Sequence, residues 1–130
     1  SLNKYYCIDN GMRSAVLLPQ SGDNGKLLEN TVFLHLNRTL QPSERIFYYQ
    51  DKCECDFVIQ RDDRIEELIQ VTWDMSDDDT RIREISGIIN AAENTRCDNL
   101  TIITNDEENE ILRDGKRIRV VPAWKWLLAK

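Results

Sequence analysis

Three polar residues on two neighbouring strand-like segments are of types that could take part in metal chemistry. The sequence CECDFVIQRDDRIEELIQVTW predicts a strand over 53–60, a polar turn, and a second strand over 65–73. Asp56 lies in the first strand, and Gln70 and Thr72 lie in the second. Since alternate residues of a strand share a face, Gln70 and Thr72 are expected to point the same way. A carboxylate beside polar residues of the next strand is how an acid-plus-lysine metal site is built, but the lysine is missing.

A fourth polar residue comes from the helix predicted over 26–40. Apolar residues recur at every fourth position of that segment, forming a stripe of Leu28, Val32, Leu36 and Leu40 with Phe33 beside it. Glu29 falls inside this stripe, where a carboxylate would point toward the core or a cleft and would be costly to leave unpaired. Two interpretations stay open: a stripe-edge glutamate whose carboxylate reaches solvent, or a member of a site.

The remaining elements follow from hydrophobic periodicity and turn residues. The patterns predict short strands over 4–8, 45–49 and 99–104, a helical turn or two over 12–18, a helix capped at 76–80 and closed at 93–96, a hairpin of 110–113 and 116–121, and a last helix over 123–128. The strands over 45–49, 53–60 and 65–73 should form an antiparallel meander. The strand over 99–104 has a continuous apolar centre, so it should lie parallel to a neighbour across the helical crossover.

Composition bounds the class of protein. The 130 residues suit one domain with one core, and 41% apolar with 31% charged residues is typical of a globular protein. The net charge of −6 opposes binding to nucleic acid. No apolar run is long enough to span a membrane and no basic-then-apolar leader is present, so we expect a cytoplasmic protein without membrane contact. Because the chain starts at Ser1 rather than at a methionine, we interpret it as a fragment of a longer protein.

Four cysteines allow two interpretations. Cys53 and Cys55 are two apart on a strand and could form a metal or disulfide site, but structural zinc usually uses a wider spacing and a second pair of ligands. His35, the single histidine, has no ligand-like partner nearby. The alternative, which we favour, is that all four cysteines are small, reduced and partly buried thiols. The acidic run over 76–80 lacks the ligand pattern of a calcium loop, and helix capping is its expected role.

The last predicted helix contains two candidate interaction residues, Trp124 and Trp126. We expect Trp124, Leu127 and Leu128 to dock on the sheet. Trp126 is expected to be more exposed and available to a partner, with packing in the core as the alternative.

Two resemblances emerge from the order of these segments. Helix, three antiparallel strands, helix and strand is the order of the restriction-endonuclease-like fold, the PD-(D/E)xK nuclease superfamily, so we expect an α/β fold of that type, α-β-β-β-α-β with a C-terminal hairpin and short helix. The chain also resembles the C-terminal domain, of unknown function, of a family of prokaryotic AAA+-type ATPases, through the blocks GKLLENTVFLHL, CECDFVIQ, LIQVTWDM, TRIREISGI, LTIITND and VVPAWKWLL.

These resemblances imply a domain organisation and a set of site residues. Residues 1–130 would be a single nuclease-like domain, and the ATP-binding domain would lie upstream, since no Walker motif is present here. In the nuclease superfamily, acids hold Mg²⁺ and a lysine helps to activate the water. By position, Glu29 matches the helix acid, Asp56 matches the first strand acid, Gln70 stands in place of the second acid, and Thr72 stands in place of the lysine.

The functional prediction follows from the differences between this chain and the nuclease pattern at Gln70 and Thr72. Glu29 and Asp56 could still bind Mg²⁺ weakly, but loss of the lysine removes transition-state stabilisation of about 2–4 kcal/mol. We therefore expect a non-catalytic, degenerate nuclease-like domain without a cofactor of its own. It would serve assembly or partner recognition, through the upstream ATPase domain, another protein or a second copy of itself.

Two alternatives remain. The first is a metal-dependent DNase that uses Glu29 and Asp56, with Gln70 as a possible third ligand; we expect these three residues to converge. The second is a DNA-binding module without catalysis. It is disfavoured by the acidic charge unless one face gathers a basic patch from Arg81, Arg83, Lys116 and Arg119.

Overall fold

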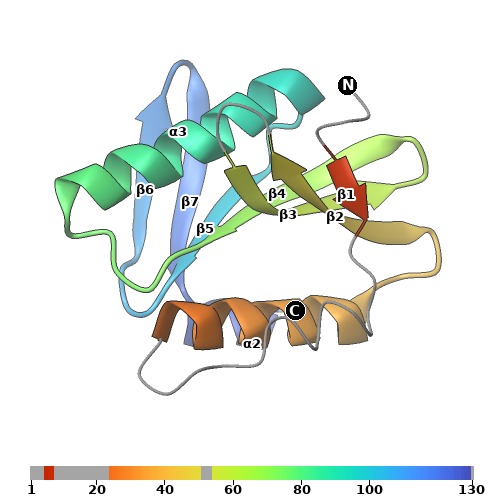
Figure 1. Ribbon diagram of the computed structural model, residues 1–130, viewed down its shortest axis with the longest axis horizontal. Coiled ribbons are helices and arrows are strands. Elements are labelled where there is room, and N and C mark those ends of the chain that lie inside the picture. The colour runs from red at the N-terminus through yellow and green to blue at the C-terminus, as the bar shows by residue number, and fades with distance from the viewer. Residues whose placement is uncertain (1–4, 8–23, 51–53, 130) are drawn as a thin grey trace.

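The computed structural model describes residues 5–7, 24–50 and 54–129, which form a sheet between two layers of helices (Figure 1). The strands are β1 (Tyr5–Cys7), β2 (Glu44–Gln50), β3 (Glu54–Arg61), β4 (Arg64–Val71), β5 (Leu100–Thr104), β6 (Asn109–Arg113) and β7 (Lys116–Pro122). The helices are α2 (Asn24–Thr39), α3 (Asp78–Thr95) and α4 (Ala123–Ala129). None of these three helices is long and apolar enough to cross a membrane.

The sheet is mixed and has the strand order β1-β2-β3-β4-β5-β7-β6. Strands β1 to β4 are successively antiparallel, β4, β5 and β7 run parallel, and β6 is antiparallel to β7. This confirms the predicted α/β class, the meander of β2, β3 and β4, and the parallel crossover from β4 to β5. The predicted hairpin also forms, with positive φ values of 54° at Asp114 and 75° at Gly115. Its second strand joins the sheet beside β5, a pairing that the sequence had not suggested.

The helix α2 covers one face of the sheet, below it in Figure 1. Its buried residues are those of the predicted stripe, Leu28, Val32, Phe33 and Leu36. They pack with side chains of the central strands, among them Phe57 and Ile69. Leu40 is half-buried at the edge of this cluster.

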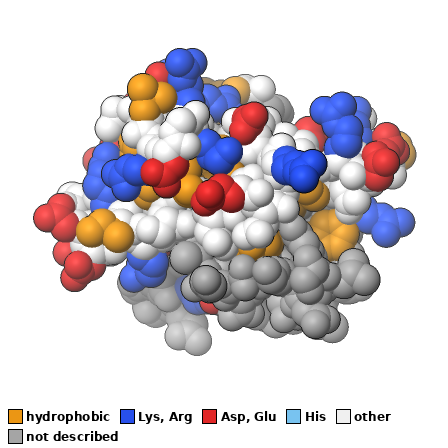
Figure 2. Space-filling model, turned by 90° about the horizontal axis from the view of Figure 1, so that it is seen from above, with side chains coloured by type: hydrophobic (Ala, Val, Ile, Leu, Met, Phe, Trp, Pro, Cys, Tyr) orange, Lys and Arg blue, Asp and Glu red, His pale blue; other side chains and the backbone are white. Residues whose placement is uncertain are grey.

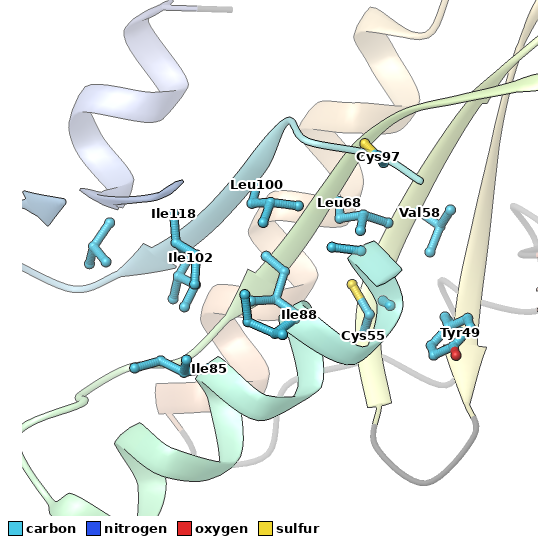
Figure 3. Close-up of a cluster of buried hydrophobic side chains, with 14 of the residues drawn as sticks. Tyr49, Cys55, Val58, Leu68, Ile85, Ile88, Cys97, Leu100, Ile102 and Ile118 are labelled. Carbon is cyan, nitrogen blue, oxygen red and sulfur yellow. The ribbon is translucent and has the colours of Figure 1, made fainter. Parts of the chain in front are cut away.

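The helix α3 covers the opposite face, over the cluster of apolar side chains shown in Figure 3. Asp77 is its N-cap and accepts a hydrogen bond from Thr80 N–H at 3.0 Å, so the acidic run does cap this helix. Ile82 precedes the buried Ile85 by three residues, but its own side chain is 60% exposed. The buried face is centred instead on Ile88 and Ala91, which places Ile82 at its edge.

The short helix α4 packs on the α2 side, and it reverses the predicted roles of its two tryptophans. Trp126 is buried, with its ring centroid 5.2 Å from that of His35 in α2. Trp124 and Leu128 are exposed, so the expectation that they dock on the sheet is wrong; Leu127 does pack there. Residues two apart on a helix point in nearly opposite directions. Burying Trp126 against α2 therefore turns Trp124 outward.

Two of the four cysteines lie in the part of the chain with described side chains. Cys55 and Cys97 are free and buried, as the thiol interpretation expects. Burial raises the pKa of the Cys55 thiol well above its usual range, and burial likewise raises the pKa of Cys97. The Cys53 part of the possible metal or disulfide pair, and the helical turn predicted over 12–18, fall outside the described residues.

The closest approach of α3 to the sheet is made possible by Gly87, in the middle of the helix. A Cβ atom at this position would lie 2.6 Å from Gln70 Nε2 and closer still to the backbone oxygen of Glu54. A backbone oxygen cannot move aside as a flexible side chain can. The helix and the sheet would therefore have to separate to accommodate any larger residue.

We predict that Gly87→Ala destabilises the fold although alanine is the better helix former. Helix propensity alone would favour the variant by about 1 kcal/mol, whereas overpacking against Glu54 should lower the free energy of unfolding by about 1–3 kcal/mol. Urea unfolding followed by circular dichroism measures the difference. Ser86→Ala, at the adjacent exposed position, is the matched control and should be neutral or slightly stabilising. A stabilised Gly87→Ala variant would mean that the close approach is wrong.

Candidate functional site

Asp56 lies in a β-bulge. Phe47 of β2 pairs with Val58 and Tyr49 pairs with Cys55, so β3 has one residue more than β2 in this interval. Cys55 and Val58 both belong to the cluster beneath α3, whereas Phe57 packs on the α2 side. The extra residue therefore shifts, at Asp56, the alternation of side chains between the two faces of the sheet. Bulges re-aim side chains in this way and often occur next to active sites.

Where β3 and β4 separate, side chains replace backbone groups in the hydrogen bonds between the two strands. The paired positions of these strands begin at Phe57 with Ile69. Beyond that pair, Asp56 N–H donates to Gln70 Oε1 and Val71 N–H donates to Asp56 Oδ2, both at 2.8 Å. Gln70 Nε2 donates to the backbone oxygens of Glu54, at 2.9 Å, and of Glu84, at 3.4 Å. Asp56 and Gln70 thus satisfy backbone groups that the ladder leaves open.

Glu29, Asp56 and Thr72 line one open cavity of about 510 Å³. The cavity lies at the C-terminal end of β4 and against the first two turns of both α2 and α3. It also contains Glu54, Asp74 and Glu84, together with Lys26 and Arg83. We call this cavity, with its five carboxylates, the acidic pocket. The positive ends of two helix dipoles border it and favour negative charge there.

Gln70 does not line the acidic pocket, although we expected it to converge with Glu29 and Asp56. Its side chain is buried beneath α3, where it contacts Asp56 through the backbone and lies against Gly87. Thr72, just beyond the end of β4, does line the acidic pocket.

The carboxylates of the acidic pocket interact electrostatically. Burial raises the pKa of Glu84, and the charges of Glu54 and Glu29 raise it further, against the opposing effect of Arg83. Burial and a hydrogen bond to Glu54 raise the pKa of the neighbouring Tyr48. Negative charge is therefore concentrated in the acidic pocket beyond what its two cations neutralise.

The acids of the acidic pocket do not form a close group of three in the described residues. Among the residues with described side chains, no three histidine, cysteine, aspartate or glutamate side chains come close enough together to hold a metal ion. In addition, Asp56 Oδ2 is bonded to Val71 N–H, so the strand acid contributes to the fold. Glu29 and Asp56 therefore share a pocket without forming a ligand set.

The sequence interpretation missed five charged residues of the acidic pocket: Glu54, Asp74, Glu84, Lys26 and Arg83. Lys26 could have been found, since it precedes Glu29 by three residues on the same helix and must lie beside it. Glu84 and Arg83 could not, because their position depends on how α3 crosses the sheet.

We predict that Gln70→Glu, which would restore the acid of the nuclease pattern, destabilises the protein. The substitution removes the amide donor to Glu54 and Glu84 and places a buried carboxylate beside two carbonyl oxygens. Such losses lower the free energy of unfolding by about 2–4 kcal/mol. Urea unfolding tests this, with the half-buried Gln60→Glu in β3 as control, for which we expect a change within about 0.5 kcal/mol. Unchanged stability of Gln70→Glu would exclude the bridging role.

We also predict that Glu84→Gln is more stable than the native chain at neutral pH. Because the pKa of Glu84 is raised in the folded state, the fold favours the protonated carboxyl, and this contribution is lost as the pH rises through that pKa. The neutral amide avoids this loss. The two free energies of unfolding should converge below about pH 4, where both states bind the proton. Glu93→Gln, on the exposed side of α3, is the matched control for the change from acid to amide.

Comparison with known proteins places the chain in a family. Residues 24–126, from α2 to α4, match the family model described as Domain of unknown function (DUF4143). A relative from Methanocaldococcus jannaschii, described as "Uncharacterized protein MJ1544", is 38% identical over 136 residues, which cover 98% of this chain. The chain spans only 30% of the length of that relative. No solved structure matches the chain. Because the family model covers most of the chain, residues 24–126, the chain belongs to the family described as Domain of unknown function (DUF4143).

Proposed function

We propose that this chain is a non-catalytic accessory domain of a larger protein, with a nuclease-like scaffold that serves assembly or partner recognition. The order α2-β2-β3-β4-α3-β5 and the shared pocket of Glu29, Asp56 and Thr72 support the restriction-endonuclease-like part of the proposal. The greater length of the relative is consistent with further domains in the same polypeptide. The resemblance to C-terminal domains of AAA+-type ATPases suggests that the neighbouring domain binds ATP in the cytoplasm.

The observation that carries the proposal is that the side chains of Asp56 and Gln70 form hydrogen bonds to the backbone of neighbouring elements. In a working metal site of this type, both positions would direct oxygen atoms at one ion. Here Asp56 accepts a hydrogen bond from Val71, and Gln70 crosses beneath α3 to Glu54 and Glu84. Both side chains bridge elements of the fold. Thr72 adds a hydroxyl where a cation would stabilise the reaction.

Ion pairing of the basic residues weighs against the alternative of a DNA-binding module. The cations that would form a patch each lie within 4 Å of a carboxylate: Arg81 with Glu107, Arg83 with Glu84, Lys116 with Asp98, and Arg119 with Glu67. Figure 2 shows basic and acidic side chains mixed over the face seen from above. No long basic stripe is visible on that face, so DNA would meet alternating charge there.

The proposal predicts no metal-dependent nuclease activity. Mn²⁺ titration by calorimetry should give no saturable heat, and a supercoiled plasmid should remain intact with Mn²⁺ or Mg²⁺. The variants Glu29→Gln and Asp56→Asn, each checked for folding by circular dichroism, should behave like the native chain. Metal-dependent nicking that both variants abolish would instead establish the DNase alternative. Salt-sensitive binding of duplex DNA without nicking would favour the DNA-binding alternative.

A further inference from the structure

We propose that the outer surface of α2 and α4 docks against an acidic, partly apolar surface of another domain in the same longer polypeptide. This outer α2–α4 face consists of Leu27, Leu34, Trp124 and Leu128, with the cations Arg38 and Lys125. The inference rests on the proposed function as an accessory domain and names the surface and the kind of partner through which it would act.

Exposed apolar side chains are concentrated on this face. Among the residues with described side chains, six large hydrophobic ones are exposed, and four of them belong to these two helices. The exposed fractions are 46% for Leu27, 42% for Leu34, 61% for Trp124 and 82% for Leu128. Leu27 and Leu34 are seven residues apart, and Trp124 and Leu128 are four apart. Each pair therefore lies along one side of its helix.

Both helices are thus apolar on two sides. The inner side of α2 contributes Val32 and Phe33 to the core, and α4 contributes Trp126. A helix that only covers a sheet normally exposes polar side chains on its outer side. Apolar residues on that side, with a tryptophan among them, are typical of a surface that another protein covers.

The charge of the face indicates the chemistry of the partner. The described residues of α2 and α4 include a single carboxylate, Glu29, which lines the acidic pocket, although the whole chain has a net charge of −6. Lys125 is ion-paired with Glu108. A second copy bound through the same face would bring Arg38 of both copies together, which is unfavourable. An acidic surface is the complementary one.

The relative is long enough to contain a further domain that carries this acidic surface. The matched region is 30% of that protein, so more than twice as much chain lies outside it. Docking within one polypeptide needs only a modest interface, because the linked domain is present at high effective concentration. A face of four apolar side chains and a few cations is suited to such a contact.

Cysteine labelling in the full-length protein tests the proposal. We would introduce Leu34→Cys or Leu128→Cys in the face, and Leu112→Cys or Ile82→Cys as controls that are 69% and 60% exposed on β6 and α3. Maleimide modification is then followed at each site by peptide mass spectrometry, which separates it from the natural cysteines. We expect labelling of the two face positions to be at least about tenfold slower than that of the controls, as a largely docked population requires. Equal rates at all four positions would overturn the proposal.

Two further measurements identify the occupant. Arg38→Glu in the same background should accelerate labelling at position 128 if the partner surface is acidic; an unchanged rate would contradict that chemistry. Protection that appears only at high protein concentration, with a doubled mass in light scattering, would show that a second copy is the occupant and would overturn the assignment to another domain. The nuclease assay is independent, since metal-dependent nicking would refute the accessory function without altering the labelling pattern.

Discussion

The hydrogen-bonded link that Asp56 and Gln70 make between β3 and β4 is the interaction on which the centre of this structure depends: Asp56 N–H donates to Gln70 Oε1, and Val71 N–H donates to Asp56 Oδ2. It occurs where β3 and β4 separate, so that the backbone groups of Asp56, Val71 and Glu54 would otherwise be left unsatisfied in a largely buried place. The amide of Gln70 also reaches α3, and Gly87 leaves the space that this contact needs. One polar pair therefore joins two strands and a helix, which explains why these side chains are held in the fold.

The same separation of strands creates the acidic pocket. A bulge at Asp56 and the first turns of two helices bring five carboxylates around one opening, with Lys26 and Arg83 beside them. The helix dipoles and access to solvent favour negative charge there, whereas burial, with a smaller effect of the charges of Glu54 and Glu29, raises the pKa of Glu84. Such a pocket can persist as a by-product of the scaffold. Among the described residues, its acids do not come together as a close group of three.

The layer of α2 and α4 has the opposite character. Its exposed side chains are mainly apolar or cationic, while most of the acidic residues lie elsewhere in the chain. Membership of the family described as Domain of unknown function (DUF4143), together with a relative more than three times as long as the matched region, fits a domain that works beside others. The acidic pocket and the outer α2–α4 face thus provide two chemically distinct surfaces to a single small domain.

The sequence by itself determined the helices, the meander, the Asp114–Gly115 turn and the capping of α3, because these depend on periodicity and on neighbouring residues. It also placed Glu29 inside the apolar stripe of α2, beside a core or a cleft. Only the tertiary structure decided that Gln70 lies beneath α3, that Trp126 rather than Trp124 is buried, and that Glu84 joins the acidic pocket. Each of these outcomes depends on a one-residue bulge or on the rotation of a helix against the sheet. Such offsets are set by contacts between residues far apart in the chain, and no local pattern encodes them.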